Sequence, residues 1–148
     1  MSTIVLDPGV ALNLAVLECE KEMAQDCGLQ LLTAPPSLDE TSDAGQIGDY
    51  LNYALHATEE EARAAALAHS LAAALATDSP KMRQLMDGRG GKTSSTLTLL
   101  VGWMRLSQMP PDRQARLAGQ LSRRALFTPP RCDPHIAWWN EQQQRRSA

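Results

Sequence analysis

The stretch LAAALATDSPKMRQLMDG, residues 71–88, has the pattern expected of two short helices with a turn between them. Leu71 and Leu75 are four residues apart, which puts both on one face of a helix. Asp78-Ser79-Pro80 then supplies an N-cap followed by a proline at the first helical position. Gly88 is well placed to end the second helix. The stretch therefore predicts two amphipathic helices joined by a capped turn.

Helical patterns continue on both sides of this stretch. Apolar residues recur at helical spacing, Thr58 and Glu61 have the spacing of a capping box, and only residues 3–6 could form a short strand. We therefore expect an all-α fold, a compact bundle of about six helices. The residues expected to be mostly buried are Met82, Leu85, Leu99, Leu100 and Trp103.

Three regions are expected from the composition. Residues 1–42 read as an acidic helical extension with a linker, because Pro35-Pro36 interrupts a mostly polar run. Residues 43–127 read as the helical core domain. Residues 128–148 read as a tail rich in proline, in which Trp138-Trp139 either docks onto the core or anchors a partner, and docking is favoured.

Charge divides the chain into two halves. Residues 1–61 hold 12 of the 17 carboxylates and one base, Lys21, for a net charge of −11. Residues 62–148 hold the other 13 bases and 5 acids, for a net charge of +8. A basic half suits a polyanionic partner and an acidic half suits a basic one.

Residues 71–88 resemble the helix-turn-helix of phage-repressor (Xre-like) and related antitoxin DNA-binding domains. The pattern of that family reads roughly L-A-x-x-L-G-V-S-x-x-x-V-S-x-L-L-N-G and aligns here without a gap. Thr96-Leu97-Thr98-Leu99-Leu100 then matches the apolar helix that follows in such domains. The resemblance covers about residues 46–107. Two ordinary helices joined by a capped turn would show the same pattern.

The resemblance implies a small transcriptional regulator that inserts the second helix of the pair into the major groove of DNA. On that helix, Arg83 and Gln84 would contact base edges. Lys81, Arg89 and Lys92 would contact phosphates, which adds affinity without sequence reading. A solvated surface is the alternative for all five side chains.

Asp7-Pro8 reads as an N-cap followed by a proline at the first helical position, and residues 10–27 read as one acidic helix with an apolar face. The face is formed by Leu12, Val16, Cys19 and Met23, and we expect it to bind a protein partner or a second copy of the chain. The alternative function that this helix suggests is a non-catalytic interaction module, such as an inhibitor, anti-activator or adaptor.

Catalytic, cofactor and metal signatures are not recognisable. The loop Gly88–Thr93 would need a glycine at Met86 to be a P-loop. Cys132 and His135 could supply half a zinc site, but no second close pair of ligands exists. No apolar run is long enough to cross a membrane, and three irregularly spaced cysteines suggest a reducing compartment. We therefore expect a cytoplasmic protein that is not an enzyme and has no cofactor.

Overall fold

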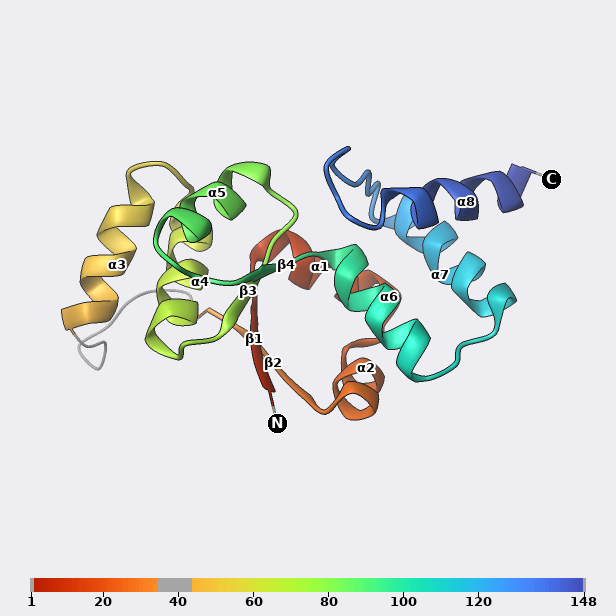
Figure 1. Ribbon diagram of the computed structural model, residues 1–148, viewed down its shortest axis with the longest axis horizontal. Helices are drawn as coiled ribbons and strands as arrows, with labels where there is room; N and C mark the ends of the chain where they lie inside the picture. Colours follow the sequence, from red (N-terminus) through yellow and green to blue (C-terminus); the bar gives the residue numbers. More distant parts are fainter. Residues whose placement is uncertain (1, 35–43, 148) are drawn as a thin grey trace.

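The centre of the molecule is a parallel β-sheet (Figure 1). The computed structural model describes residues 2–34 and 44–147, and within them four strands pair in the order β2-β1-β3-β4. Helices cover both faces of this sheet. The expectation of an all-α bundle is therefore wrong, and the fold is α/β.

The strands are short and begin near the start of the chain. They are β1 (Ser2–Leu6), β2 (Leu29–Thr33), β3 (Ala74–Ala76) and β4 (Thr93–Ser94). In the register, Val5 of β1 pairs with Leu32 on one side and with Leu75 on the other. Val5 and Leu75 are fully buried, as expected of inner strands in a parallel sheet covered on both faces.

Helices connect the strands and follow β4. They are α1 (Pro8–Leu17), α2 (Glu20–Cys27), α3 (Ala44–Ala54), α4 (Glu59–Ser70), α5 (Pro80–Gly88), α6 (Thr96–Leu106), α7 (Pro111–Arg124) and α8 (Ile136–Ser147). None of the helices in the described residues is long and apolar enough to cross a bilayer.

Two apolar layers form on opposite sides of the sheet. Leu6 and Ala76 contribute to the layer with α1, α2, α6 and α7. Val5 and Leu75 contribute to the layer with α3, α4 and α5. Because neighbouring residues of a strand point to opposite faces, this alternation makes a three-layer sandwich. Figure 1 shows α3, α4 and α5 on one side of the strands and α2, α6 and α7 on the other.

The expected helix-turn-helix is not formed, because its first helix is absent. Helix α4 ends at Ser70, Ala72 takes a left-handed conformation with φ of 51°, and residues 74–76 form β3. Burial of Leu75 and Ala76 beside β1 outweighs the helical preference of alanine. The second helix of the pair is present as α5, and Ser79 caps it.

Residues 10–27 form two helices rather than the single helix expected. The break is at Glu18, whose φ is 53° and which ends α1. Residues 1–42 were expected to form an extension, yet within them β1 and β2 make half of the sheet. Most of the linker expected around Pro35-Pro36, from about residue 33 to residue 45, lies outside the described residues.

The C-terminal region packs against the body of the protein. Trp139 is 6% exposed and meets Phe127 edge-on, and the Trp138 indole N–H donates to Gln114. The prediction that the tryptophan pair docks onto the core is therefore confirmed. Burial is also confirmed for Met82, Leu99, Leu100 and Trp103, whereas Leu85 is only partly buried.

Candidate functional site at the carboxyl edge of the sheet

The direction in which the chain adds strands to the sheet reverses between β1 and β3. From β1 the chain continues to β2 on one side, and from β3 it continues to β4 on the other. In open parallel sheets, such a reversal leaves a crevice at the carboxyl ends of the two strands, and ligands commonly bind there. Here each of the two strands is followed by an aspartate, Asp7 after β1 and Asp78 after β3.

Asp7 is held at the start of α1. Its carboxylate caps the helix by accepting from the Val10 N–H at 2.8 Å and also accepts a hydrogen bond from the Thr77 side chain. The residue is 5% exposed. Burial raises the pKa of Asp7, the two hydrogen bonds lower it by less, and the negative charges of Asp78 and Glu61 raise it further.

Asp78 joins three parts of the fold. One carboxylate oxygen accepts from the Thr96 N–H at 3.0 Å, and the other accepts from the Thr96 hydroxyl at 2.6 Å and from the Asn13 amide at 3.3 Å. Burial raises the pKa of Asp78, and the hydrogen bonds from Thr96 only partly offset this. The buried Asp133 raises the pKa further, while Arg83 lowers it.

Both aspartates line one hollow of about 320 Å³, which we call the central hollow. Its other polar walls come from the N-terminal turn of α4 and the cap of α5, namely Thr58, Glu60, Glu61 and Ser79. The capping box predicted from Thr58 and Glu61 is present, and it fixes the start of α4 beside the hollow. Four carboxylates therefore surround this space.

Lone pairs on Asp7 and Asp78 remain available in this arrangement. An ionised carboxylate can accept about four hydrogen bonds. Asp7 accepts two and Asp78 accepts three, so each can still contact a ligand. Carboxylate oxygens that face a shared hollow and repel one another favour a hard cation such as Mg²⁺.

Three protein ligands for a metal ion do not converge anywhere in residues 2–34 and 44–147. Mg²⁺ does not require such a cage, since it is usually bound by one or two carboxylates, with waters and substrate phosphates as the other ligands. The central hollow, with the buried Asp7 and the partly buried Asp78, fits this second kind of site.

In comparisons with known proteins, no protein-family model, curated protein or solved structure matches the chain.

Two further hollows adjoin the central one. The Lys81 hollow, of about 430 Å³, shares Thr58, Glu61 and Ser79 with it and is also lined by His56 and Lys81. The Arg63 hollow, of about 190 Å³, shares Pro8 and Glu60 with it. The three form one trough along the carboxyl edge, with carboxylates in the middle and a cation on each side.

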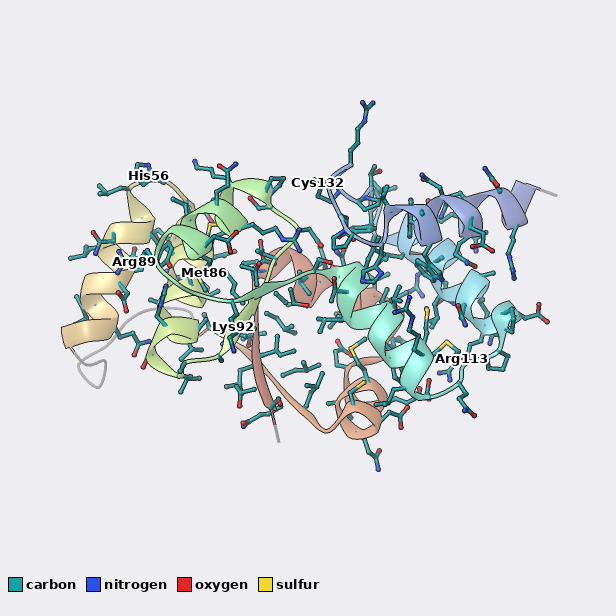
Figure 2. The ribbon with its side chains drawn as sticks, in the orientation of Figure 1. His56, Met86, Arg89, Lys92, Arg113 and Cys132 are labelled. Carbon is teal, nitrogen blue, oxygen red and sulfur yellow. The ribbon has the colours of Figure 1, made fainter. Side chains whose placement is uncertain are left out.

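None of the five side chains expected to contact DNA lines the central hollow, and four of them are not among the groups that shift the pKa of its aspartates. Lys92 precedes β4 and is therefore at the amino edge of the sheet, and Figure 2 shows it well separated from His56. Arg89 pairs with Asp49 at 2.6 Å and lies over the ring of Tyr53. Gln84 lines a different hollow beside Arg89, and Lys81 stands exposed in the trough.

Arg83 is the exception among the five, because its positive charge acts on Asp78. It is partly buried, and its Nε atom is buried without a hydrogen-bond partner. The phase of α5 therefore turns Arg83 toward the carboxyl edge rather than fully into solvent.

The predicted partner-binding face of residues 10–27 is divided between interior and surface. Cys19 and Met23 are buried in the chain's own core, Val16 is partly buried, and Leu12 is 60% exposed. Burial raises the pKa of Cys19 to about 12, so the thiol is inert. Only Leu12 of this face is freely available to a partner.

Sequence reasoning missed Asp7 and Asp78 as a pair. Asp7 was identified only as a helix cap, and Asp78 as part of a turn. The signal that could have found them is an aspartate directly after a short apolar run, in Ile4-Val5-Leu6-Asp7 and again in Ala74-Leu75-Ala76-Thr77-Asp78. Such runs end at the same edge of a parallel sheet.

We expect Asp7→Asn to stabilise the protein at neutral pH, raising Tm by roughly 2–4 °C. The pKa of Asp7 is raised in the folded state, so folding is favoured by protonation and stability falls as pH rises through that pKa. Asparagine keeps the cap and removes the buried charge. Thermal melts at pH 7.5 should show the gain and melts near pH 4 a smaller one. An exposed control, Asp112→Asn, should not change Tm, and a lower Tm for Asp7→Asn at pH 7.5 would contradict the expectation.

Proposed function

We propose that the chain binds a divalent cation at Asp7 and Asp78 and hydrolyses phosphodiester bonds in a single strand of nucleic acid. The observation that supports this is the position of the buried Asp7 and the partly buried Asp78, both with raised pKa, at the point where the strand order reverses. Groups with perturbed pKa in such a crevice are candidates for chemistry. The proposal keeps nucleic acid as the partner and replaces the helix-turn-helix with the carboxyl edge of the sheet.

The chemistry follows from the charges in the trough. A cation between Asp7 and Asp78 would neutralise phosphate oxygens and lower the pKa of a bound water. Hydrolysis at this place would form a bond from a water oxygen to phosphorus as that water releases a proton to solvent, and the bond to the leaving oxygen would break as that oxygen takes a proton from solvent. The two aspartates would hold the cation, while Lys81 would hold the adjoining phosphate.

The shape of the trough favours a single strand over a duplex. Each hollow measures 190–430 Å³, which suits one nucleotide or part of one, and the central hollow shares lining residues with each of the other two. Cations on both sides of a carboxylate centre match a polymer with one phosphate per residue. Lys81 and Arg63 occupy these flanking positions.

Two measurements on the wild-type protein test the proposal. Mg²⁺ or Mn²⁺ at about 10 mM should raise Tm by a few degrees, since a ligand that binds only the folded state stabilises it. The same cations should support cleavage of single-stranded RNA or DNA, and EDTA should stop it. A Tm that neither cation changes, together with intact substrate, would refute the function.

The cation effect should depend on Asp7 and Asp78 specifically. Asp7→Asn should lose the rise in Tm that Mn²⁺ produces, while Asp87→Asn, on an exposed part of α5 outside the trough, should retain it. A rise of equal size in both variants would place the cation elsewhere.

A further inference from the structure

The Arg63 hollow contains a buried cation with few partners. The Arg63 side chain is 12% exposed, and its Nε atom is buried without a hydrogen bond. Its guanidinium lies 3.7 Å from Glu59, beyond hydrogen-bonding distance, and Glu59 itself is 79% exposed. Within the described residues, the mostly buried guanidinium of Arg63 therefore has one long ion pair, with Glu59, and its Nε atom has no hydrogen bond. A buried guanidinium with free donors costs stability unless an anion contacts it.

The walls of the hollow are mostly apolar. Leu6 and Pro8 line it at the end of β1, Ala34 lies just after β2, and Ala64 lies beside Arg63 on α4. Glu60 also lines the hollow, at the side shared with the central hollow, and its side chain is exposed to solvent. An anionic group that enters this hollow would lose part of its hydration and contact the guanidinium of Arg63. The planar arrangement of the guanidinium donors is suited to phosphate.

The Arg63 hollow also lies at one end of the trough. It is next to the central hollow, on the side away from Lys81, and β2 is the edge strand there. A strand that crosses the carboxylates from the Lys81 side would therefore place its last group beside Arg63. That group can carry two negative charges only if it is a terminal phosphate.

We infer that the Arg63 hollow binds the terminal phosphate of the nucleic-acid strand, so that the protein prefers strands with a phosphorylated end. The inference rests on the proposed function for the identity of the ligand, but phosphate binding by Arg63 does not require a cation. It assigns Arg63 as a specificity-determining residue, with Glu60 as a negative charge that weakens the site.

The experiment is equilibrium binding of short single strands with a 5′-phosphate, a 3′-phosphate or hydroxyl groups at both ends. EDTA is present, so cation-dependent cleavage cannot interfere. Wild-type protein should bind one of the phosphorylated strands at least about tenfold more tightly than the hydroxyl strand, as expected for charge-assisted contacts to a dianion. Inorganic phosphate is tested as a competitor.

Arg63→Met should lose the preference, and Arg63→Lys should keep part of it, because lysine retains the charge without the fork. Glu60→Gln should strengthen binding of the phosphorylated strand. Arg116→Met, an exposed arginine on α7, is the matched control and should keep the full preference. Melting curves identify any variant that is unfolded. If Arg63→Met does not fold, a partial loss of the preference in Arg63→Lys is the test of the role of Arg63.

Equal affinity of the wild-type protein for phosphorylated and hydroxyl strands would overturn the inference. Inorganic phosphate that binds as tightly as the phosphorylated strand would overturn the assignment to a strand end. These outcomes are separate from failure of the proposed function. A protein that prefers phosphorylated ends in EDTA but cleaves nothing with Mg²⁺ would support the inference and refute the hydrolysis.

Discussion

Replacing Asp78 with asparagine is expected to slow cation-dependent strand cleavage at least about a thousandfold. Asparagine has nearly the same shape and can still accept the Thr96 N–H bond, so the fold around it should persist. What it removes is the negative charge that would hold the cation opposite Asp7. Single-turnover cleavage of a labelled strand with Mg²⁺ measures the effect.

The control for this variant is Asp87→Asn, the same substitution on an exposed residue of α5 outside the trough. It should cleave at the wild-type rate. The double variant, with both Asp7→Asn and Asp78→Asn, should cleave only slightly more slowly than either single variant. The reason is that the two aspartates act as one site. An Asp78→Asn protein with more than a tenth of the wild-type rate would show that the cation does not bind there.

Trp103→Ala is expected to cost about 3–5 kcal/mol of unfolding free energy, a large share of the stability of an ordinary domain. Trp103 is fully buried in the layer with α1, α2 and α7. Its indole N–H donates to Asp26 at 2.8 Å, and Arg113 lies over its ring, so the side chain joins α2, α6 and α7. Urea unfolding at neutral pH measures the loss.

Leu106→Ala provides the comparison, since Leu106 is on the same helix and 63% exposed. It should change the unfolding free energy by less than about 1 kcal/mol. If Trp103→Ala cost no more than Leu106→Ala, the packing of α6 against α2 and α7 described above would be incorrect.

The helices could be predicted from the sequence because their signals are local. The Thr58–Glu61 capping box, the Ser79-Pro80 start of α5 and the apolar run of α6 each lie within a few residues, and the structure has all three. The Asp7-Pro8 start of α1 was also recognised, although the helix ends earlier than expected.

The sheet could not be predicted in the same way. Ala74-Leu75-Ala76 favours helix by propensity, and it becomes a strand only because it pairs with β1, about 70 residues away. The two-residue strand β4 likewise forms by pairing with β3, and Ser95 just after it caps α6. Tertiary pairing decides both segments, and no short window of sequence contains that information.

The candidate site also could not be predicted from short windows of the sequence. Asp7 and Asp78 are 71 positions apart, so their spacing in the sequence gave no sign of a shared function. Glu61 was recognised for its part in a helix cap, which the structure shows, but not for its place beside the aspartates. The expectation that the protein is not an enzyme rested on spacing along the chain and stays a prediction.

The position of β1 also affects how the protein can be made in the cell. Strand β3, which pairs with β1, emerges from the ribosome long after β1 does. Until then, the edge of β1 that will pair with β3 is open to solvent or to another chain. Synthesis takes several seconds over such a distance. Slow translation between the two strands would lengthen this exposure. Slow codons in residues 34–73 should therefore lower the yield of folded protein more than slow codons after β4. The protein that is lost should be found as aggregate.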